Sequence, residues 1–347
     1  MHVINARNVN DALAAGLRYL HTHGDQATSR NGDVLVSPMP VTTVYDMPKE
    51  RVLFSAIRDA NPFFHLMEAL WMLAGRNDVA FPAQFAKHIA SFSDDGIQFH
   101  AAYGHRWRTY FAHDQLQWVI DELRRDPTSR RIVLAMWDPG NEHPLGSIAR
   151  YVSGDHHSIN CGTKDVPCNT HIYFLLTGGA LDMTVCNRSN DIIWGAYGAN
   201  AVHMSVLHEF VAAAIGKPVG IYRQVSNNYH LYTNVVARDS ILDMAKDVME
   251  SNLYVLTTQV RSAITPLMTI PQKEWDAELR DFINCDPLKA NIFTDPFLRT
   301  VAFPMYRAWA IRKADRNASN AVLEVLAQVS SVDWRYAATS WVARRIK

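Results

Sequence analysis

The sequence predicts an α+β fold, in which a mixed or antiparallel sheet is flanked by helices and followed by a helical carboxy-terminal extension. Two strand-like runs, residues 171–177 and 180–187, are joined by a Gly-Gly pair, which is a strong β-hairpin signal. A long apolar helix is expected over residues 201–215. From about residue 295 onward the chain is wholly helical in character, with three segments rich in Ala, Trp, Val and Arg.

The most sharply marked helix begins at Asn61-Pro62, because asparagine is a good N-cap and proline is favoured at the first helical position. Gly75 is expected to end it. The remaining expected elements are a helix over 9–21, strands over 34–36 and 41–45, a helix over 115–125, a β-prone run over 131–137, a strand over 219–226 and a helix over 233–251.

One long segment interrupts this pattern. Residues 138–166 are rich in Gly, His, Asp and Ser, and a loop of this length in a compact domain is either functional or an insertion. We expect residues 1–294 to form the main domain, which includes this segment, and residues 295–347 to form the helical extension.

The composition excludes several classes of protein. The 347 residues include 34 Lys+Arg and 34 Asp+Glu, and this balance argues against phosphate-driven binding of duplex nucleic acid. With 48% hydrophobic and 20% charged residues the chain is not disordered. No apolar run of membrane-spanning length and no signal-peptide pattern occur, so we expect a cytoplasmic protein without membrane contact. Four cysteines are too few for a disulfide framework.

Cys168 is the first candidate for chemistry. Pro167 fixes an extended approach to it, and its neighbours are polar, which indicates an exposed loop-to-strand junction. Taken alone, a free cysteine is more often a small buried hydrophobe. A metal site would draw on nearby residues, but their spacing matches no paired zinc pattern; these residues are His156, His157, Cys161, Cys168 and His171.

Arginines stand beside serines at two strand ends. Arg188-Ser189 ends the hairpin, and Ser129 precedes Arg130 and Arg131. Adjacent arginines are usually part of a solvated face. A guanidinium beside a hydroxyl can instead clamp a phosphate, because its donors form a rigid fork.

These residues belong to a larger pattern, and with it the chain resembles the thymidylate synthase family, which includes the nucleotide 5-hydroxymethylases of phages. The resemblance runs from about Arg30 to Tyr232, with one extra residue between Gly195 and Asn200. Its most specific block consists of Pro167-Cys168, Arg188-Ser189, Asp191, Gly195, Asn200, Gly220, His230 and Tyr232. It implies that residues 1–294 form the catalytic domain of a thymidylate synthase-like fold.

The resemblance implies a covalent mechanism. The thiolate of Cys168 would add to C6 of a pyrimidine nucleoside monophosphate, making C5 nucleophilic toward the methylene of 5,10-methylenetetrahydrofolate. A cysteine with a pKa of about 8.5 is mostly protonated at neutral pH, so it needs nearby positive charge, which Arg188 and the other arginines around the bound phosphate would supply. Arg30, Arg188 and Ser189 would hold the phosphate together with Arg130 and Arg131 of a partner subunit, which implies a homodimer.

The same resemblance assigns the remaining roles. Asn200 would pair with the ring, and an amide complements N3–H and O4 of uracil, whereas family members that use cytosine tend to carry aspartate there. Glu68 would handle protons through ordered water, and Tyr103 would help remove the C5 proton. His230 and Tyr232 would bind the sugar 3′-hydroxyl, Asp191 would contact the pterin of the folate, and no metal is expected.

Three departures bear on the outcome of the reaction. Asn169 stands where synthases usually carry histidine. Phe92, in the segment 91–95, stands where a tryptophan packs on the folate, and Phe303, in the segment 300–305, would replace the short apolar tail that seals it. A looser seal admits water to the transferred carbon and therefore favours hydroxymethylation.

The expected function is dUMP hydroxymethylase, giving 5-hydroxymethyl-dUMP. The alternatives are a thymidylate synthase that converts dUMP to dTMP, a (d)CMP 5-hydroxymethylase, and a catalytically inactive nucleotide- or RNA-binding paralogue. If the protein is encoded by a phage, its cytoplasm is that of the host.

Overall fold

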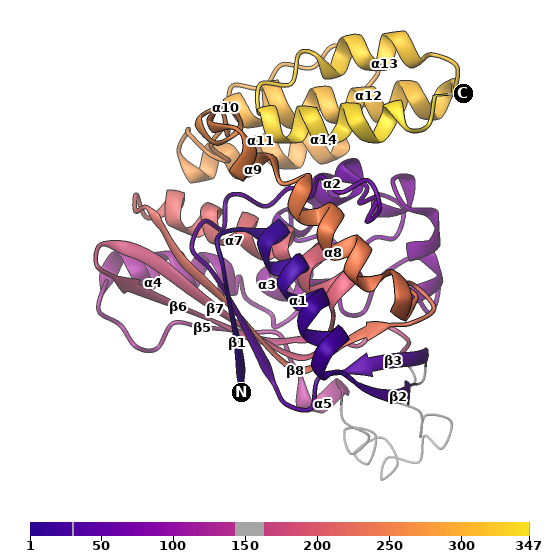
Figure 1. Cartoon of the computed structure of the whole chain (residues 1–347). Coiled ribbons are helices and arrows are strands. Elements are labelled where there is room, and N and C mark those ends of the chain that lie inside the picture. The colour runs from indigo at the N-terminus through magenta and orange to yellow at the C-terminus, as the bar shows by residue number, and fades with distance from the viewer. Residues whose placement is uncertain (30, 143–162, 347) are drawn as a thin grey trace.

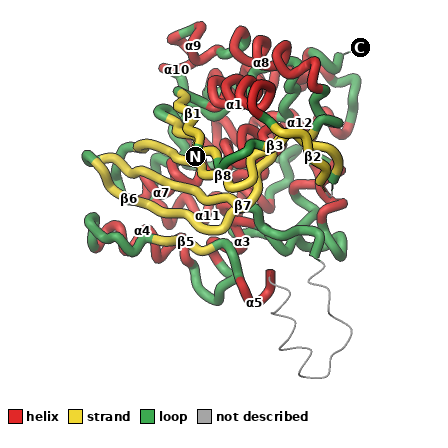
Figure 2. The backbone as a smooth tube through the Cα atoms, turned by 60° about the horizontal axis from the view of Figure 1, so that its bottom comes forward, coloured by secondary structure: helices red, strands yellow, loops and turns green. Residues whose placement is uncertain are grey.

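The computed structural model describes residues 1–29, 31–142 and 163–346, and the expected loop over 138–166 therefore lies mostly outside the described residues. Within these ranges eight strands form one mixed sheet, ordered β1-β4-β8-β7-β6-β5, with β3 on β8 and β2 on β3 (Figures 1 and 2). The strands are β1 (His2–Ala6), β2 (Asp25–Ser29), β3 (Gly32–Val36), β4 (Val41–Tyr45), β5 (Val133–Ala135), β6 (Asn169–Thr177), β7 (Ala180–Asp191) and β8 (Val219–Tyr232). The α+β prediction is confirmed.

The centre of the sheet brings the two predicted halves of the site together. β6 and β7 form the expected hairpin across Gly178 and Gly179, both of which have positive φ, the region that favours glycine. β7 then pairs with β8 in parallel, so that Asp191 lies opposite His230. The sheet register thus places residues that are far apart in the sequence next to each other.

Helices pack against this sheet, and the carboxy-terminal helices form a further layer beyond it (Figure 1). They are α1 (Val9–His23), α2 (Pro62–Leu73), α3 (Tyr103–Arg108), α4 (Gln115–Arg125), α5 (Pro139–Glu142), α7 (Asn200–Ala214), α8 (Ile241–Glu250), α9 (Leu253–Leu256), α10 (Thr258–Ser262), α11 (Gln272–Asn284), α12 (Phe303–Ala314), α13 (Ser319–Leu326) and α14 (Val332–Ala343). Short 3-10 or π segments lie at η1 (Pro82–Gln84), η2 (Lys87–Phe92), η3 (Ile192–Ala199), η4 (Arg238–Ser240) and η5 (Leu298–Ala302). No helix in the described ranges is both long and apolar enough to cross a membrane.

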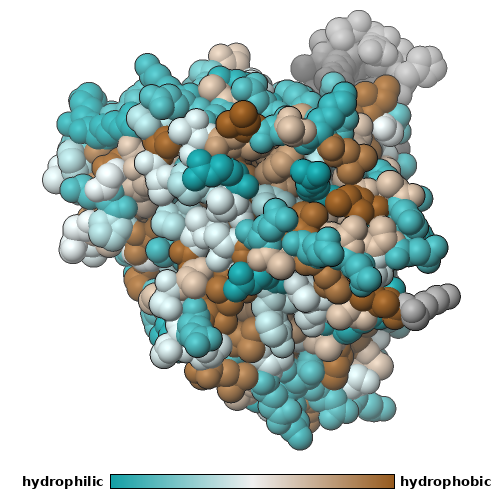
Figure 3. Space-filling view, turned by 90° about the horizontal axis from the view of Figure 1, so that it is seen from above, coloured by the Kyte–Doolittle hydropathy of each residue, from teal (hydrophilic) through white to brown (hydrophobic). Residues whose placement is uncertain are grey.

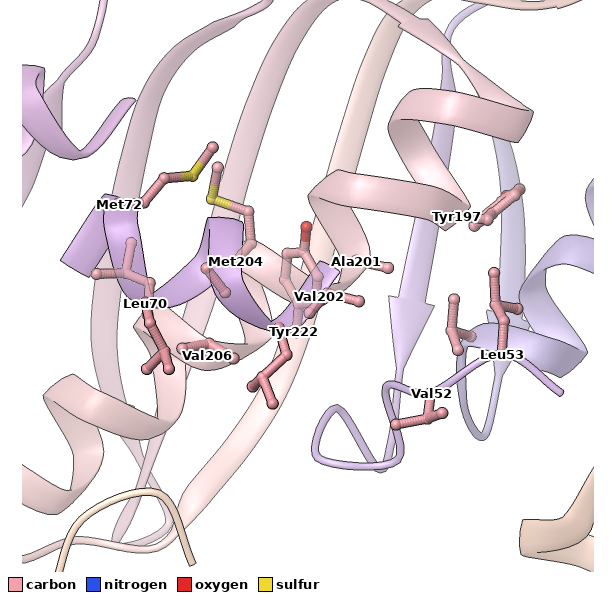
Figure 4. Close-up of a cluster of buried hydrophobic side chains, with 14 of the residues drawn as sticks. Val52, Leu53, Leu70, Met72, Tyr197, Ala201, Val202, Met204, Val206 and Tyr222 are labelled. Carbon is pink, nitrogen blue, oxygen red and sulfur yellow. The ribbon is translucent and has the colours of Figure 1, made fainter. Parts of the chain in front are cut away.

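Helix α7 lies at the centre of the hydrophobic core, and its residues 200–212 are all buried. It packs on β7, β8 and α2, and Figure 4 shows Val202, Met204 and Val206 beside Leu70 of α2 and Tyr222 of β8. Full burial of one such apolar side chain contributes about 1.5–3 kcal/mol. A helix buried on all sides therefore holds any polar side chain it carries in a fixed place.

Helix α2 begins as predicted. The side-chain oxygen of Asn61 accepts hydrogen bonds from the backbone N–H groups of Phe63 (3.1 Å) and Phe64 (3.2 Å). Its outer face packs on the carboxy-terminal helices, because the Phe63 ring lies 5.3 Å from that of Trp309 and 5.8 Å from that of Trp341. The helix is thus clamped between α7 and the extension.

Two elements differ from prediction. The expected helix over 233–251 begins only at Ile241, because β8 continues to Tyr232 and the chain then turns, with the Thr233 N–H donating to the Asp33 carbonyl at 3.0 Å. The β-prone run over 131–137 forms a strand only at 133–135. The helical tail is confirmed as α12–α14, and the boundary at residue 294 stays a prediction.

Candidate active site

Cys168 lies directly before β6, where the end of β7 passes it. The backbone N–H of Arg188 donates to the Cys168 carbonyl at 2.9 Å, and its side-chain Nε donates to the Pro167 carbonyl at 2.9 Å. These bonds hold the Arg188 guanidinium 3.9 Å from the Cys168 sulfur. The structure therefore brings the predicted nucleophile and its predicted cation together.

The charge of Arg188 does not by itself activate the thiol. Burial raises the pKa of Cys168 above its ordinary value, Arg188 opposes this, and the carboxylates of Asp165 and Asp191 add to it. The net shift is upward, so the thiol of the free protein is protonated at neutral pH. Arg188 is the part of the expected positive charge that the free protein supplies, and the arginines that hold the bound phosphate, which were expected to add to it, stay a prediction.

Tyr103 lies beside this thiol, at the first residue of α3. Burial raises its pKa strongly, and the neighbouring Cys168 adds to that shift. The phenol is therefore a hydroxyl at every pH of interest, able to donate one hydrogen bond and accept another. The fully buried Asn169 lies next to it.

Glu68 has a partner that the sequence did not indicate. His203, on α7, places its Nε2 atom 3.0 Å from Oε2 of Glu68, on α2. Both side chains are buried, and neither of these atoms, nor Nδ1 of His203, has a well-formed hydrogen bond among the described residues. His203 lies one turn beyond Asn200 on a helix that is buried on every side. A histidine in such an apolar helix was the available signal.

A chain of buried amides fixes the orientation of Asn200. The Ala196 carbonyl can only accept, so the Gln224 amide turns its Nε2 toward it (3.0 Å). Oε1 of Gln224 then accepts from Nδ2 of Asn190 (2.8 Å), and Oδ1 of Asn190 accepts from Nδ2 of Asn200 (3.1 Å). We call Gln224, Asn190 and Asn200 the amide relay. It leaves Asn200 with its oxygen and one N–H unassigned.

The Asp191 carboxyl lies on a second side of the site, near the Cys168 thiol. Burial raises its pKa to about 6, against the opposing charge of Arg58, and its Oδ1 is buried without a hydrogen-bond partner among the described residues. The Arg58 guanidinium donates to the Ile193 carbonyl (2.8 Å) and lies over the Trp194 ring at 5.1 Å. Trp194 is 52% exposed. Sequence reasoning missed both Arg58 and Trp194, whose neighbourhood exists only in the folded chain.

Among the residues predicted to bind the phosphate and sugar, Ser189, His230 and Tyr232 lie on the paired strands β7 and β8. The β7–β8 pairing places Ser189 opposite Asn228, near His230, whose ring lies 5.0 Å from that of Tyr232. Burial lowers the pKa of His230, so this imidazole is neutral at pH 7. Arg30 lies outside the described residues.

In the described part of the single chain, no hydrogen bond or ring contact links four of the predicted residues to this cluster. Val133 pairs with Tyr173, and the same register carries Arg131 along β6 to roughly 20 Å from Cys168, with Arg130 beyond it. Phe92 is 51% exposed at the end of η2. Phe303 lies in the carboxy-terminal layer, with its ring 5.7 Å from that of Phe293.

In the part of the chain that the structure describes, no group of three or more His, Cys, Asp or Glu side chains could hold a metal ion. Of the candidates named from the sequence, His156, His157 and Cys161 lie outside the described residues.

A half-buried thiol beside an arginine, a tyrosine hydroxyl, a carboxylate and an oriented amide define a site for covalent chemistry on a polar heterocycle. The chain belongs to the thymidylate synthase family, whose model matches residues 14–264. It is accordingly a one-carbon transferase of that family with the family's fold.

Individual relatives differ in their named activities. The deoxyuridylate hydroxymethyltransferase of Pseudomonas phage M6 is 47% identical over 99% of this chain and 95% of its own length. The deoxyuridylate hydroxymethyltransferase of Bacillus phage SP01 is 37% identical over 56% of this chain and 49% of its own length. A putative thymidylate synthase of Methanosarcina acetivorans is 26% identical over 72% of this chain and 94% of its own length.

Proposed function

We propose that this enzyme is a dUMP hydroxymethylase, which transfers the methylene of 5,10-methylenetetrahydrofolate to C5 of dUMP and completes the product with water. The names of the phage relatives support the reaction, and with them a place in the cytoplasm of a host cell. The observation from the structure that carries the choice of base is the fixed orientation of Asn200.

The amide relay favours uracil over cytosine. Asn200 offers an oxygen that accepts the N3–H of uracil and an N–H that donates to O4. Cytosine needs the opposite pattern, which would turn the Asn200 oxygen toward the oxygen of Asn190. Buried polar groups left unpaired or opposed cost about 1–3 kcal/mol each, which is enough to separate two substrates.

The folate supplies the carbon, and residues of the Asp191 side fit its polar ring. The orphaned Oδ1 of Asp191 is an acceptor without a donor, and the exposed indole of Trp194 lies next to it, held by Arg58. We propose that Asp191 accepts from a ring N–H and that Trp194 takes over the stacking role of the missing tryptophan. Phe92 and Phe303 remain further candidates for the folate side.

The reacting residues then have separate tasks. Cys168 loses its proton as the nucleotide enters and adds its sulfur to C6. C5 forms a bond to the methylene carbon, and the hydroxyl oxygen of Tyr103 takes the C5 proton as the phenol gives its own proton to water. The folate nitrogen takes up a proton and departs, the oxygen of a water molecule adds to the transferred carbon, and the water's proton passes to the Glu68–His203 pair. Cys168 is expelled as C5 and C6 regain their double bond. Arg188, Ser189, His230 and Tyr232 hold the phosphate and sugar.

Replacing His203 tests the proton pathway. We expect His203→Leu to lower kcat by on the order of 100-fold, because it removes a proton carrier beside Glu68, while KM for dUMP changes little. His203→Gln, which restores an N–H at that place, should recover part of kcat with an altered pH profile. Unchanged kcat in the leucine variant would remove His203 from the mechanism.

We propose a homodimer in which Arg130 and Arg131 reach the phosphate site of the partner. Tyr173 and Leu175 of β6 are exposed, as is Val133 of β5 opposite Tyr173, which leaves an apolar strip on the sheet face beside Arg131. Mixing inactive Cys168→Ala with inactive Arg131→Ala should restore activity, because mixed dimers contain one intact site. No recovery after subunit exchange would contradict shared sites.

The decisive experiment is product analysis. The enzyme is incubated with 5,10-methylenetetrahydrofolate and each of dUMP, dCMP, UMP and CMP, and the nucleotide mass and the folate product are measured. We expect 5-hydroxymethyl-dUMP and tetrahydrofolate. Stoichiometric dihydrofolate with dTMP would instead make the enzyme a thymidylate synthase, the activity named for the Methanosarcina relative.

A further inference from the structure

A groove of about 1130 Å³ lies where η1 and η2 meet α12 and α14, at the end of the molecule seen in Figure 3. Six cationic side chains line it, and no carboxylate is among its lining residues. They are Lys87, Arg312, Lys313, Arg316, Arg344 and Arg345. We call this surface the cationic groove. It lies largely in the carboxy-terminal helices, beyond the residues 14–264 that match the family model.

The charges of the groove are not balanced within the protein. Asp59 is the one carboxylate that pairs with it in the described ranges, through Arg344 (3.0 Å) and Arg345. The other four cations form no ion pair with any described residue. Burial, and then repulsion from Arg345 and Arg316, lowers the pKa of Arg312. Like charges gathered without counter-ions are stabilised by an anion from outside.

The donors of the groove are held in place. The Arg345 guanidinium lies 3.7 Å and that of Arg312 5.7 Å from the centre of the Trp341 ring, so one indole orients two forks of donors. Nη1 of Arg312 and Nε1 of Trp341 are buried and have no hydrogen-bond partner among the described residues. Buried donors are normally satisfied, and their vacancy here indicates a missing acceptor.

We propose that the cationic groove binds an organic polyphosphate of the nucleoside triphosphate class. A triphosphate places several charges and many acceptor oxygens in a short chain, which matches clustered guanidinium forks better than isolated carboxylates do. The groove is too large for orthophosphate alone, since pockets of roughly 300–1000 Å³ hold whole organic ligands. Trp309 and Phe85 supply aromatic wall for the remainder of such a ligand.

Calorimetric titration of the full-length protein tests this site. Saturating dUMP keeps the active site occupied, and the probes are dATP, dTTP, inorganic tripolyphosphate and orthophosphate. We expect the triphosphates to bind, orthophosphate to bind far more weakly, and the affinity to fall with salt. Tighter binding of dATP or dTTP than of tripolyphosphate would show that the nucleoside contributes. Equal binding would show that the nucleoside makes no contact with the groove and would overturn the assignment to a nucleoside triphosphate.

Paired variants locate the binding. Arg312→Gln combined with Arg316→Gln removes two groove cations and should weaken triphosphate binding at least about tenfold. Arg307→Gln removes an exposed cation of the same helix outside the groove and should leave it unchanged. Lys313→Gln, at an exposed position, serves if the double variant does not fold. Absence of binding at millimolar triphosphate, or an equal loss of binding in the Arg307→Gln control, would overturn the proposal.

Discussion

At the scale of single residues, the site depends on neighbouring side chains that fix the orientation of groups which could otherwise rotate. An isolated asparagine can present either pattern to a base by turning its amide over. Here Asn200 cannot, because Asn190 and Gln224 fix it from behind. Gly195 makes room for this arrangement, since a Cβ there would lie 2.7 Å from Oδ1 of Asn190.

The relay changes the expected effect of the simplest specificity swap. Asn200→Asp offers the right acceptor to cytosine but sets an oxygen against the Asn190 oxygen, so we expect it to lose dUMP turnover without gaining much for dCMP. Adding Gln224→Leu frees the Asn190 amide to turn over and donate to the new carboxylate. Kinetics with both nucleotides should show a gain for dCMP in the double variant beyond the sum of the single effects. Additive effects would mean that the relay does not orient the base.

Asp191 gives a pH dependence with a definite sign. Its pKa of about 6 lies above the ordinary 3.8, so the carboxyl is protonated, and a poor acceptor, below about pH 6. We expect kcat/KM for the folate to fall as the pH drops through 6. In Asp191→Asn this decrease of kcat/KM at low pH should be absent.

The same group affects stability in the opposite sense. Between pH 3.8 and about 6 the folded protein binds the Asp191 proton more tightly than the unfolded chain does, so the free energy of unfolding falls as the pH rises through this range. The free energy of unfolding of Asp191→Asn should not show this decrease. Its difference from the original protein, measured by denaturant unfolding, should therefore favour the variant more at pH 7 than at pH 4. A stability difference that does not vary with pH would contradict the raised pKa.

At the scale of elements, the chain is predictable where local chemistry decides and unpredictable where distant segments do. The cap at Asn61 and the hairpin at Gly178 followed from a few adjacent residues. The length of β8 did not, because Thr233 bonds to Asp33, two hundred residues away. The Cys168–Arg188 contact follows from the family pattern, whereas Arg58 and His203 could be placed only by the packed structure.

The approach of α3 to α2 depends on one glycine. A Cβ on Gly104 would overlap the carbonyl oxygen of Met72, which is backbone and cannot turn aside. We expect Gly104→Ala to cost at least about 2 kcal/mol and to reduce activity, because it moves Tyr103 and Glu68 apart. Gly178→Ala, with open space around it, is the matched control, with only the cost of its positive φ. Similar losses in the two variants would argue against a packing effect.

At the scale of the whole molecule, the carboxy-terminal helices are part of the core rather than an appendage. Phe63 packs on Trp309 and Trp341, and Tyr254 donates a hydrogen bond to the buried carboxylate of Asp333 (2.9 Å). The extension thus supports both α2 and the groove.

A chain that ends at residue 294 tests this dependence. We expect it to be insoluble or to unfold without cooperativity, because truncation bares the apolar face of α2 and leaves Tyr254 without its partner. Calorimetry and circular dichroism of the truncated chain would measure this. A cooperative transition with retained dUMP binding would show that the predicted boundary separates two independent domains.

The complete burial of α7 has a consequence for motion. Amide hydrogens of residues 203–212 can exchange with solvent only when the centre of the protein opens, so their protection should approach that of global unfolding. Local opening at lower free energy is expected instead in exposed elements such as η2, which has no buried residue. We therefore expect the side of the site that carries Asn200 to stay rigid during turnover.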